Sequence, residues 1–402
     1  MTNQKPSIVG AIFLVSGTSV GAGMLAQPVA ASLIGFIPST LMMFVAWAFM
    51  TSTALILLEV SLWMKQDSHI ISMASQILGP TGKWVAWIIY LFIAYLSLAA
   101  YISGGGDIFK VAISNFTSVL LPDWLICSLF VFVFGIVIEL GTKTVGKLNT
   151  ILFCGLVVSY IFIISLGAPG IKADNLLQAN FDHAYFILPL FLTSFSFQMI
   201  VPSLATYLNR DRSRLRLAIL IGTSLSFLIY LLWNIVVLGH LSIGTGSDLA
   251  AAYAKGSPPI SVLGGSSEQA WFGTAIQIFA FFALVTSFIG LAWGLFDFLA
   301  DGFAIKKAGK NRIGLWLLVM FPPLLLALSY PRGFIGALET TGGFGDTILN
   351  GILPVLMFWI GCYKYKKLSE SYFLKNRTYL CLLVLFAFLV IALEAIHQFH
   401  IF

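Results

Sequence analysis

The 402-residue chain consists mainly of long apolar segments separated by short polar ones. Eleven of these segments have about 20 residues or more and are bounded by charges, Pro or Gly, and this is the length that a helix needs to cross a bilayer. A transmembrane β-barrel is excluded, because its strands would alternate in polarity over about 10 residues. The pattern therefore predicts an all-α integral membrane protein with one domain over residues 1–402. Its eleven transmembrane helices are expected at residues 8–35, 38–64, 84–109, 124–141, 148–168, 185–208, 216–240, 271–301, 313–330, 333–362 and 378–398.

Composition supports this class. Hydrophobic residues make up 59% of the chain and charged residues only 9%, against about 25% charged in soluble domains. Such a chain cannot cover a water-exposed surface, so a soluble enzyme is excluded. An intramembrane enzyme is not expected either, because the spans contain no set of nucleophile, base or metal ligands such as H-E-x-x-H.

The basic residues predict the orientation. With a cytoplasmic N-terminus, 18 of the 22 Lys and Arg residues lie on the cytoplasmic side. Cytoplasmic loops of membrane proteins are enriched in this way, so the C-terminus is expected outside. The net charge of +6 is then explained by insertion into a lipid bilayer, and no nucleic-acid partner is expected. Only Lys110, Lys172, Lys255 and Arg332 fall on the outer side.

The first span contains an interruption. Gly17, Gly21 and Gly23 lie close together before Pro28, and each glycine costs about 1 kcal/mol against alanine in a helix interior. One interpretation is a G-x-x-x-G face, from Gly17 to Gly21, at which two helices approach closely. The other is an unwound segment at mid-depth, which is tolerated only where the backbone lines a cavity.

The sixth span contains a second interruption, at residues 193–198 before Pro202. Between the beginning of the first span and the beginning of the sixth, the chain crosses the membrane five times. Because five is odd, these two helices cross the membrane in opposite senses. Residues 8–168 and 185–362 can therefore form inverted five-helix repeats, with residues 378–398 as an additional helix. Paired broken helices in such repeats are typical of the substrate site of a secondary transporter.

The two breaks suggest a ligand. The half-helix that begins near Gly21 and Gly23 presents free amides, which suit a carboxylate, and half-helices that end near Gly17 and Phe195 present carbonyls, which suit an ammonium group. An amino acid fits both, and the site is expected to contain no formally charged residue. The candidate substrate-binding residues are Gly17, Thr18, Ser19, Gly21, Ala22, Gly23, Tyr95, Phe195, Ser196, Phe197, Gln198 and Phe282.

The chain also resembles the bacterial aromatic amino acid permeases, in order over almost its whole length. The most specific motifs are GTSVGAGML at residues 17–25 and GLFDFLAD at residues 294–301. Further matches are residues 57–60, 100–106, 193–195, 201–203, 286–290, 321–323 and 330–334. Within this family the resemblance is stronger to tyrosine-specific than to tryptophan permeases.

This resemblance implies a member of the amino acid/polyamine/organocation (APC) superfamily with a LeuT-like five-plus-five inverted repeat. It implies import of an aromatic amino acid, tyrosine first and tryptophan next, by symport with H⁺ in the bacterial inner (cytoplasmic) membrane. The chain departs from the family at Gln198, where permeases often carry histidine, so a histidine there cannot carry protons. No cofactor is expected, and the protein is expected to be a monomer. A sensor or a channel with the same fold is the alternative function.

Polar residues within the spans are candidates for coupling or gating. Charged groups inside a membrane are costly and are commonly functional. Glu59, Asp297 and Glu339 are therefore candidates for coupling or gating; Glu59 and Asp297 can alternatively be structural hydrogen-bonded acids. The hydroxyls of Thr286 and Ser287 offer oxygen ligands for Na⁺, or they bond to their own helix. The sequence therefore leaves Na⁺ open as an alternative coupling ion.

Overall fold

The computed structural model describes residues 7–64, 68–116, 121–139, 141–182, 184–240, 251, 253, 270–306, 308–329, 333–367 and 374–399. Within these residues the chain is helical, apart from turns and one isolated bridge between Gly35 and Ala179. Of the four basic residues predicted on the outer side, Lys255 and Arg332 lie outside the described part of the chain.

The first half of the chain contains the helices α1 (Ile8–Ser19), α2 (Gly23–Ala31), α3 (Phe36–Trp63), α4 (Ile70–Phe116), α5 (Asp123–Glu139) and α6 (Thr142–Gly167). The connection to the sixth span contains η1 (Ala168–Gly170) and α7 (Ala173–Leu177). The sixth span itself is divided into η2 (Ala184–Ile187), α8 (Leu188–Ser194), η3 (Gln198–Ile200) and α9 (Val201–Tyr207).

The second half continues with α10 (Arg212–His240), α13 (Ala270–Gly302), α14 (Gly309–Ser329) and α15 (Gly333–Thr340). A π-helix, η4 (Thr341–Ile352), then joins α15 to α16 (Leu353–Tyr363), and α17 (Arg377–Phe399) follows. Every predicted span thus coincides with helical structure.

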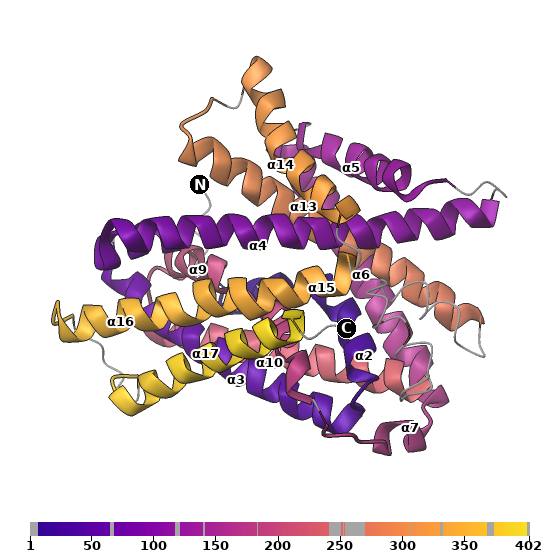
Figure 1. The fold of residues 1–402 in the computed structure, drawn as a ribbon, viewed down its shortest axis with the longest axis horizontal. Coiled ribbons are helices and arrows are strands. Elements are labelled where there is room, and N and C mark those ends of the chain that lie inside the picture. Colours follow the sequence, from indigo (N-terminus) through magenta and orange to yellow (C-terminus); the bar gives the residue numbers. More distant parts are fainter. Residues whose placement is uncertain are drawn as a thin grey trace.

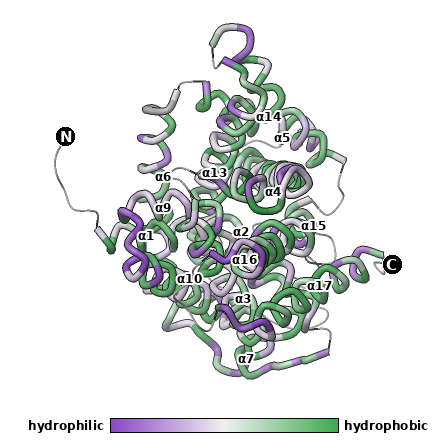
Figure 2. Tube along the Cα trace, turned by 90° about the vertical axis from the view of Figure 1, so that its left-hand side faces the viewer, coloured by the Kyte–Doolittle hydropathy of each residue, from purple (hydrophilic) through white to green (hydrophobic). Residues whose placement is uncertain are grey.

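Nine helical segments of the described chain are long and apolar enough to cross a membrane, or ten if α1 and α2 form one bent span. The remaining predicted span folds as α5, whose 17 residues are at the lower limit of about 17 for crossing the hydrocarbon. The exposed apolar side chains of α6 and α17, such as Val158 and Leu385, are those of a lipid-facing surface. The chain is a multi-pass membrane protein, and hydrophobic residues predominate along its helices (Figure 2).

The third span differs from its prediction at its N-terminal end. Helical structure begins at Ile70 rather than at residue 84, but it is interrupted at Gly79, whose φ of 79° is not helical. Pro80 follows, and proline is favoured in the first turn of a helix because its missing amide would have no partner there. The first turns of α4 are therefore a separate segment, and the long span begins at Pro80.

Helix α4 lies in the middle of the molecule. In both views α5 and α14 lie on one side of it, and α3, α15, α16 and α17 lie on the other, whereas α13 extends past it on both sides in Figure 1 (Figures 1 and 2). The buried residues form two hydrophobic clusters, and α13 contributes residues to both. Tyr90 and Tyr101 of α4 pack against both clusters, so α4 joins the two parts.

Candidate functional site

The first span is broken where the glycines predict it. Helix α1 ends at Ser19, α2 begins at Gly23, and the two axes differ by 57°. The Ala22 amide donates to the hydroxyl of Ser287 on α13 at 3.1 Å, so a side chain of another helix replaces a bond within the span. A Cβ at Gly17 would meet only the Phe153 ring, at 3.5 Å, and one at Gly21 would meet the Ser287 hydroxyl at 2.7 Å. Neither glycine touches the backbone of a neighbouring helix, which favours the unwound segment over the G-x-x-x-G face.

The sixth span is broken in the same manner. Helix α8 ends at Ser194, and the helical structure resumes with η3 at Gln198. The Phe197 amide donates to the side-chain oxygen of Gln198 at 2.9 Å, and the Gln198 amide group donates to the Met50 carbonyl on α3 at 3.1 Å. Buried backbone groups freed by a break require such partners.

Helix α10 connects the two breaks. The buried Tyr230 hydroxyl lies 2.6 Å from the Ser19 carbonyl and 2.7 Å from the Ser194 carbonyl, so it contacts the C-terminal ends of both half-helices. One turn along, Trp233 Nε1 donates to the Met24 carbonyl at 3.0 Å. Pro28 has no amide to offer this carbonyl, four residues before it. The indole thus replaces the bond that the proline removes.

A cavity of about 500 Å³ lies at the two breaks. Its volume is within the range of about 300–1,000 Å³ that is usual for small-molecule sites. Residues from α4, α6, α13 and η4 complete its wall. Of the predicted substrate, coupling and gating residues, those that line it are Gly17, Thr18, Ser19, Gly21, Ala22, Gly23, Ser196, Phe197, Thr286 and Ser287.

Four predicted substrate-binding residues are described but do not belong to this wall. The Tyr95 hydroxyl donates to the Leu318 carbonyl at 3.1 Å, and Phe195 packs edge-on against Tyr230. Gln198 is fully buried, and its amide is used by the backbone of the break. The Phe282 ring lies over Gly155 of α6. These four side chains therefore contact other parts of the protein and do not line the cavity.

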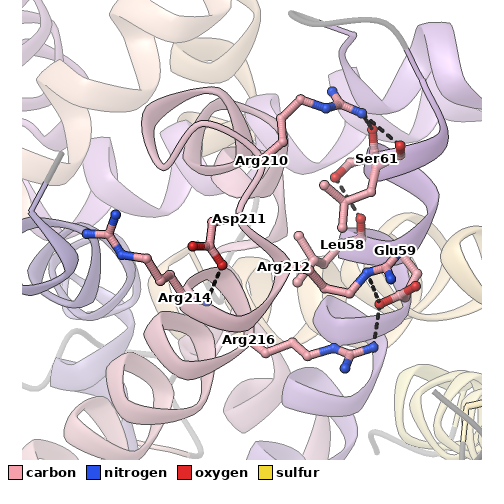
Figure 3. Close-up of polar contacts among 9 residues, drawn as sticks. Leu58, Glu59, Ser61, Arg210, Asp211, Arg212, Arg214 and Arg216 are labelled. Atoms are coloured by element: carbon pink, nitrogen blue, oxygen red, sulfur yellow. Dashed lines mark hydrogen bonds and ion pairs between the residues drawn. The ribbon is translucent and has the colours of Figure 1, made fainter. Parts of the chain in front are cut away.

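Glu59 is part of an ionic contact between α3 and α10 (Figure 3). Its buried carboxylate Oε1 lies 2.7 Å from Arg216 Nη2 and 3.4 Å from Arg212 Nε. Beside it, Arg210 Nη2 donates to the carbonyls at the end of α3, at 2.7 Å from Leu62 and 3.0 Å from Met64. This geometry favours the structural alternative for Glu59, as an acid that anchors the start of α10.

Replacing Glu59 by glutamine should therefore lower stability more than transport. The change removes the carboxylate from two arginines whose side chains are 22% and 32% exposed. Water partly solvates them, so we expect a loss of about 1–3 kcal/mol, measured as a lower Tm in detergent.

Asp123→Asn is the matched control, because its ion pair with Lys110 is exposed, at 75% and 47%, and should contribute little. An unchanged Tm for Glu59→Gln together with a loss of gradient-driven uptake would instead assign Glu59 to coupling.

The other two predicted acids also lie outside the cavity wall. Glu339 is buried on α15, and its Oε1 accepts a hydrogen bond from the Tyr253 hydroxyl at 2.6 Å. Arg332, the basic residue nearest to Glu339 in the sequence, lies outside the described residues. Asp297 is half-buried on α13. Their roles in coupling or gating remain predictions.

The structure corrects one expectation, that the site contains no formal charge. Asp346 of η4 lines the cavity. Its Oδ1 accepts hydrogen bonds from the Ser196 hydroxyl and from Asn350 Nδ2, each at 2.7 Å. One feature of the sequence could have identified Asp346 as a site residue. It is an acid in the middle of the predicted span 333–362, just after the glycines at 342 and 343. Only the packing of η4 against α8 brings this acid to the break.

The structure thus describes a multi-pass helical protein with a cavity at two broken helices. The chain belongs to the tryptophan/tyrosine permease family, whose model matches residues 4–394. This confirms the family that the motifs indicated. The proteins of this family that resemble the chain are transport proteins, and the chain is a permease rather than an enzyme.

Three relatives illustrate the match. The tyrosine-specific transport system 1 of Haemophilus influenzae is 33% identical over 386 residues, which is 94% of each chain. The tryptophan-specific transport protein of the same organism is 32% identical and covers 89% of this chain and 88% of its own. The tyrosine permease of Enterobacter agglomerans is 26% identical over 87% of this chain and 86% of its own.

Proposed function

We propose that the protein is a secondary active transporter that imports an aromatic amino acid, tyrosine in preference to tryptophan, by symport with H⁺. It works as a monomer in the bacterial inner membrane, with a cytoplasmic N-terminus and a periplasmic C-terminus. The observation that carries the proposal is the cavity of about 500 Å³ at the breaks of the first and sixth spans. The names of the relatives, which are tyrosine- or tryptophan-specific, support the substrate class.

The ends of the half-helices suit a zwitterion. Helix α2 begins at Gly23 in the cavity wall, and the first amides of a helix have no acceptors within it, so they favour a carboxylate. The opposite ends, at Ser19 and Ser194, present carbonyls that already contact Tyr230. A carbonyl oxygen has two lone pairs, so these carbonyls can also accept from an ammonium group.

Helix packing supports an inverted repeat. In such a repeat, α1 and α2 correspond to α8 and α9, α3 to α10, α4 to α13, α5 to α14, and α6 to α15 and α16. Each contact between two helices should then have an equivalent contact between their counterparts. Helix α1 packs on α10 as α8 and α9 pack on α3; α4 packs on α14 as α13 packs on α5; and α4 packs on α15 as α13 packs on α6. Alternating access would then consist of movement of the broken helices against α4, α5, α13 and α14.

The choice of H⁺ rests on what the resemblance of the motifs to the aromatic amino acid permeases implies, and Na⁺ is the alternative. The Thr286 hydroxyl donates to the Phe282 carbonyl of its own helix at 2.8 Å, which is the back-bonded arrangement. The Ser287 hydroxyl accepts from the Ala22 amide at 3.1 Å. Each hydroxyl oxygen still has a lone pair to offer, so the experiment must separate the two ions.

The test is uptake of labelled tyrosine, tryptophan and phenylalanine into proteoliposomes, with pH and sodium gradients imposed separately. We expect an inward pH gradient to concentrate tyrosine above its external level and a sodium gradient to have no effect. Accumulation with sodium alone would replace H⁺ by Na⁺. Equilibration without accumulation under either gradient would favour a channel, and binding without transport would favour a sensor.

A further inference from the structure

Asp346 is a buried acid in the wall of the cavity, and one of its oxygens is unused. The residue is 1% exposed. Its Oδ1 accepts from Ser196 and Asn350, whereas its Oδ2 is buried without a hydrogen-bond partner among the described residues. A carboxylate oxygen in this state is available to a proton or to a ligand.

Asp346 also differs in its charge environment from Glu59 and Glu139, two acids of the spans that pair with arginine. Glu59 and Glu139 each form an ion pair with arginine, at 2.7 Å and 2.8 Å. Within the described part of the chain, no Lys, Arg or His forms an ion pair with Asp346. Burying an unpaired carboxylate is costly, and such a group becomes neutral by taking up a proton.

The titratable groups around Asp346 are few. Helix α8, which carries Thr193 and Ser194 in the cavity wall, contributes none. Helix α4 contributes the hydroxyls of Tyr90 and Tyr101, which line the cavity. Helices α3, α15, α16 and α17 carry titratable or charged side chains that do not belong to the wall, namely Glu59, Glu339, Cys362, Tyr363, Arg377, Tyr379, Cys381, Glu394 and His397.

We propose that Asp346 carries the coupled proton of the transport cycle. An H⁺ from the outer solution forms an O–H bond with the carboxylate at Oδ2 while the cavity is open outward. The same O–H bond breaks and releases H⁺ to the cytoplasm when the cavity is open inward. No other bond forms or breaks. The inference rests on the proposed function and deepens it by naming the residue that couples H⁺ to substrate.

The hydrogen bonds of Asp346 explain how the proton acts on the substrate site. Ser196 lies in the break between α8 and η3 and lines the cavity. Its hydroxyl donates to the carboxylate at 2.7 Å, and hydrogen bonds to an ionised acceptor are roughly twice as strong as neutral ones. Protonation of Asp346 therefore weakens the bond that holds Ser196, and deprotonation strengthens it. The protonation state is thus transmitted directly to a broken helix of the site.

Asp346→Asn tests this role, because asparagine keeps the volume and the accepting oxygen but cannot take up the proton. We expect the variant to retain measurable exchange of external labelled tyrosine for internal tyrosine, at a lower rate than the wild type because its bond to Ser196 is weaker. It should not accumulate tyrosine under a pH gradient, and substrate should no longer drive H⁺ entry, recorded with an internal pH dye. Accumulation at the wild-type level would overturn the proposal. Loss of exchange in a variant with an unchanged Tm would also overturn it, since Asp346 would then be a substrate ligand.

Two further variants complete the experiment. Glu394→Gln changes another acid that is fully buried and has an unpartnered Oε2, but which lies outside the cavity wall, and it should keep proton-driven accumulation. If Asp346→Asn does not fold, Asp346→Glu keeps a titratable group and should remain coupled with a displaced pH profile of uptake. An unchanged profile would count against the proposal. The proposed function fails separately, if the wild-type protein neither exchanges nor accumulates aromatic amino acids.

Discussion

Leucine in place of Gly21 is expected to abolish substrate binding and uptake while the protein remains folded. A Cβ at this position would lie 2.7 Å from Ser287 Oγ, closer than non-bonded atoms approach. Ser287 cannot simply turn away, because its hydroxyl accepts the Ala22 amide at 3.1 Å. The remaining leucine atoms would enter the cavity beside the start of α2. Overpacking of this kind costs about 1–3 kcal/mol, which the fold can tolerate and a substrate site cannot.

The measurement is equilibrium binding of labelled tyrosine, with Tm recorded on the same preparation. Gly314→Leu is the matched control, because Gly314 is exposed on α14 and a Cβ there would meet nothing within 4 Å. This control should bind as the wild type does. If Gly21→Leu also bound normally, the glycines would be a packing face and the unwound segment would not be part of the substrate site.

Replacing Tyr230 by phenylalanine should have the second largest effect, a loss of binding by about tenfold or more. The hydroxyl lies within 2.7 Å of both the Ser19 and the Ser194 carbonyls. The hydroxyl has one proton, which it donates to one of these two carbonyls at a time, and a buried group left unsatisfied costs about 1–3 kcal/mol. We expect the two half-helix ends to shift relative to each other and part of this cost to appear as weaker tyrosine binding. A loss of about 1.4 kcal/mol already corresponds to a tenfold lower affinity.

Tyr160→Phe provides the control for Tyr230→Phe. The Tyr160 hydroxyl donates to the Ile229 carbonyl of α10 at 2.9 Å, so the same oxygen is lost at a contact with the same helix. Tyr160 does not line the cavity, and its variant should lower Tm without weakening tyrosine binding. If the two variants weakened binding equally, the effect would come from a loss of α10 packing and not from the link between the two breaks.

Local properties of the sequence were sufficient for the spans and the breaks. The length of an apolar segment determines whether it can cross a bilayer, and this holds regardless of its neighbours. Gly17, Gly21 and Gly23 weaken a helix in any surroundings, and α1 ends at Ser19 among them. For the same reason the predicted residues on the broken backbone itself, such as Gly21 and Ser196, do line the cavity.

The tertiary structure alone decided which side chains meet. Asp346 and Ser196 are 150 positions apart, and nothing local to either one indicates that they are hydrogen-bonded. Within an apolar span, a lone aromatic or acidic residue gives no sign of the helix face that will meet the cavity. Phe282 therefore packs on α6, and Glu59 pairs with arginines of α10. Membrane-spanning length and helix breaking are properties of one segment, whereas the chemistry of the site depends on packing between segments far apart in the chain.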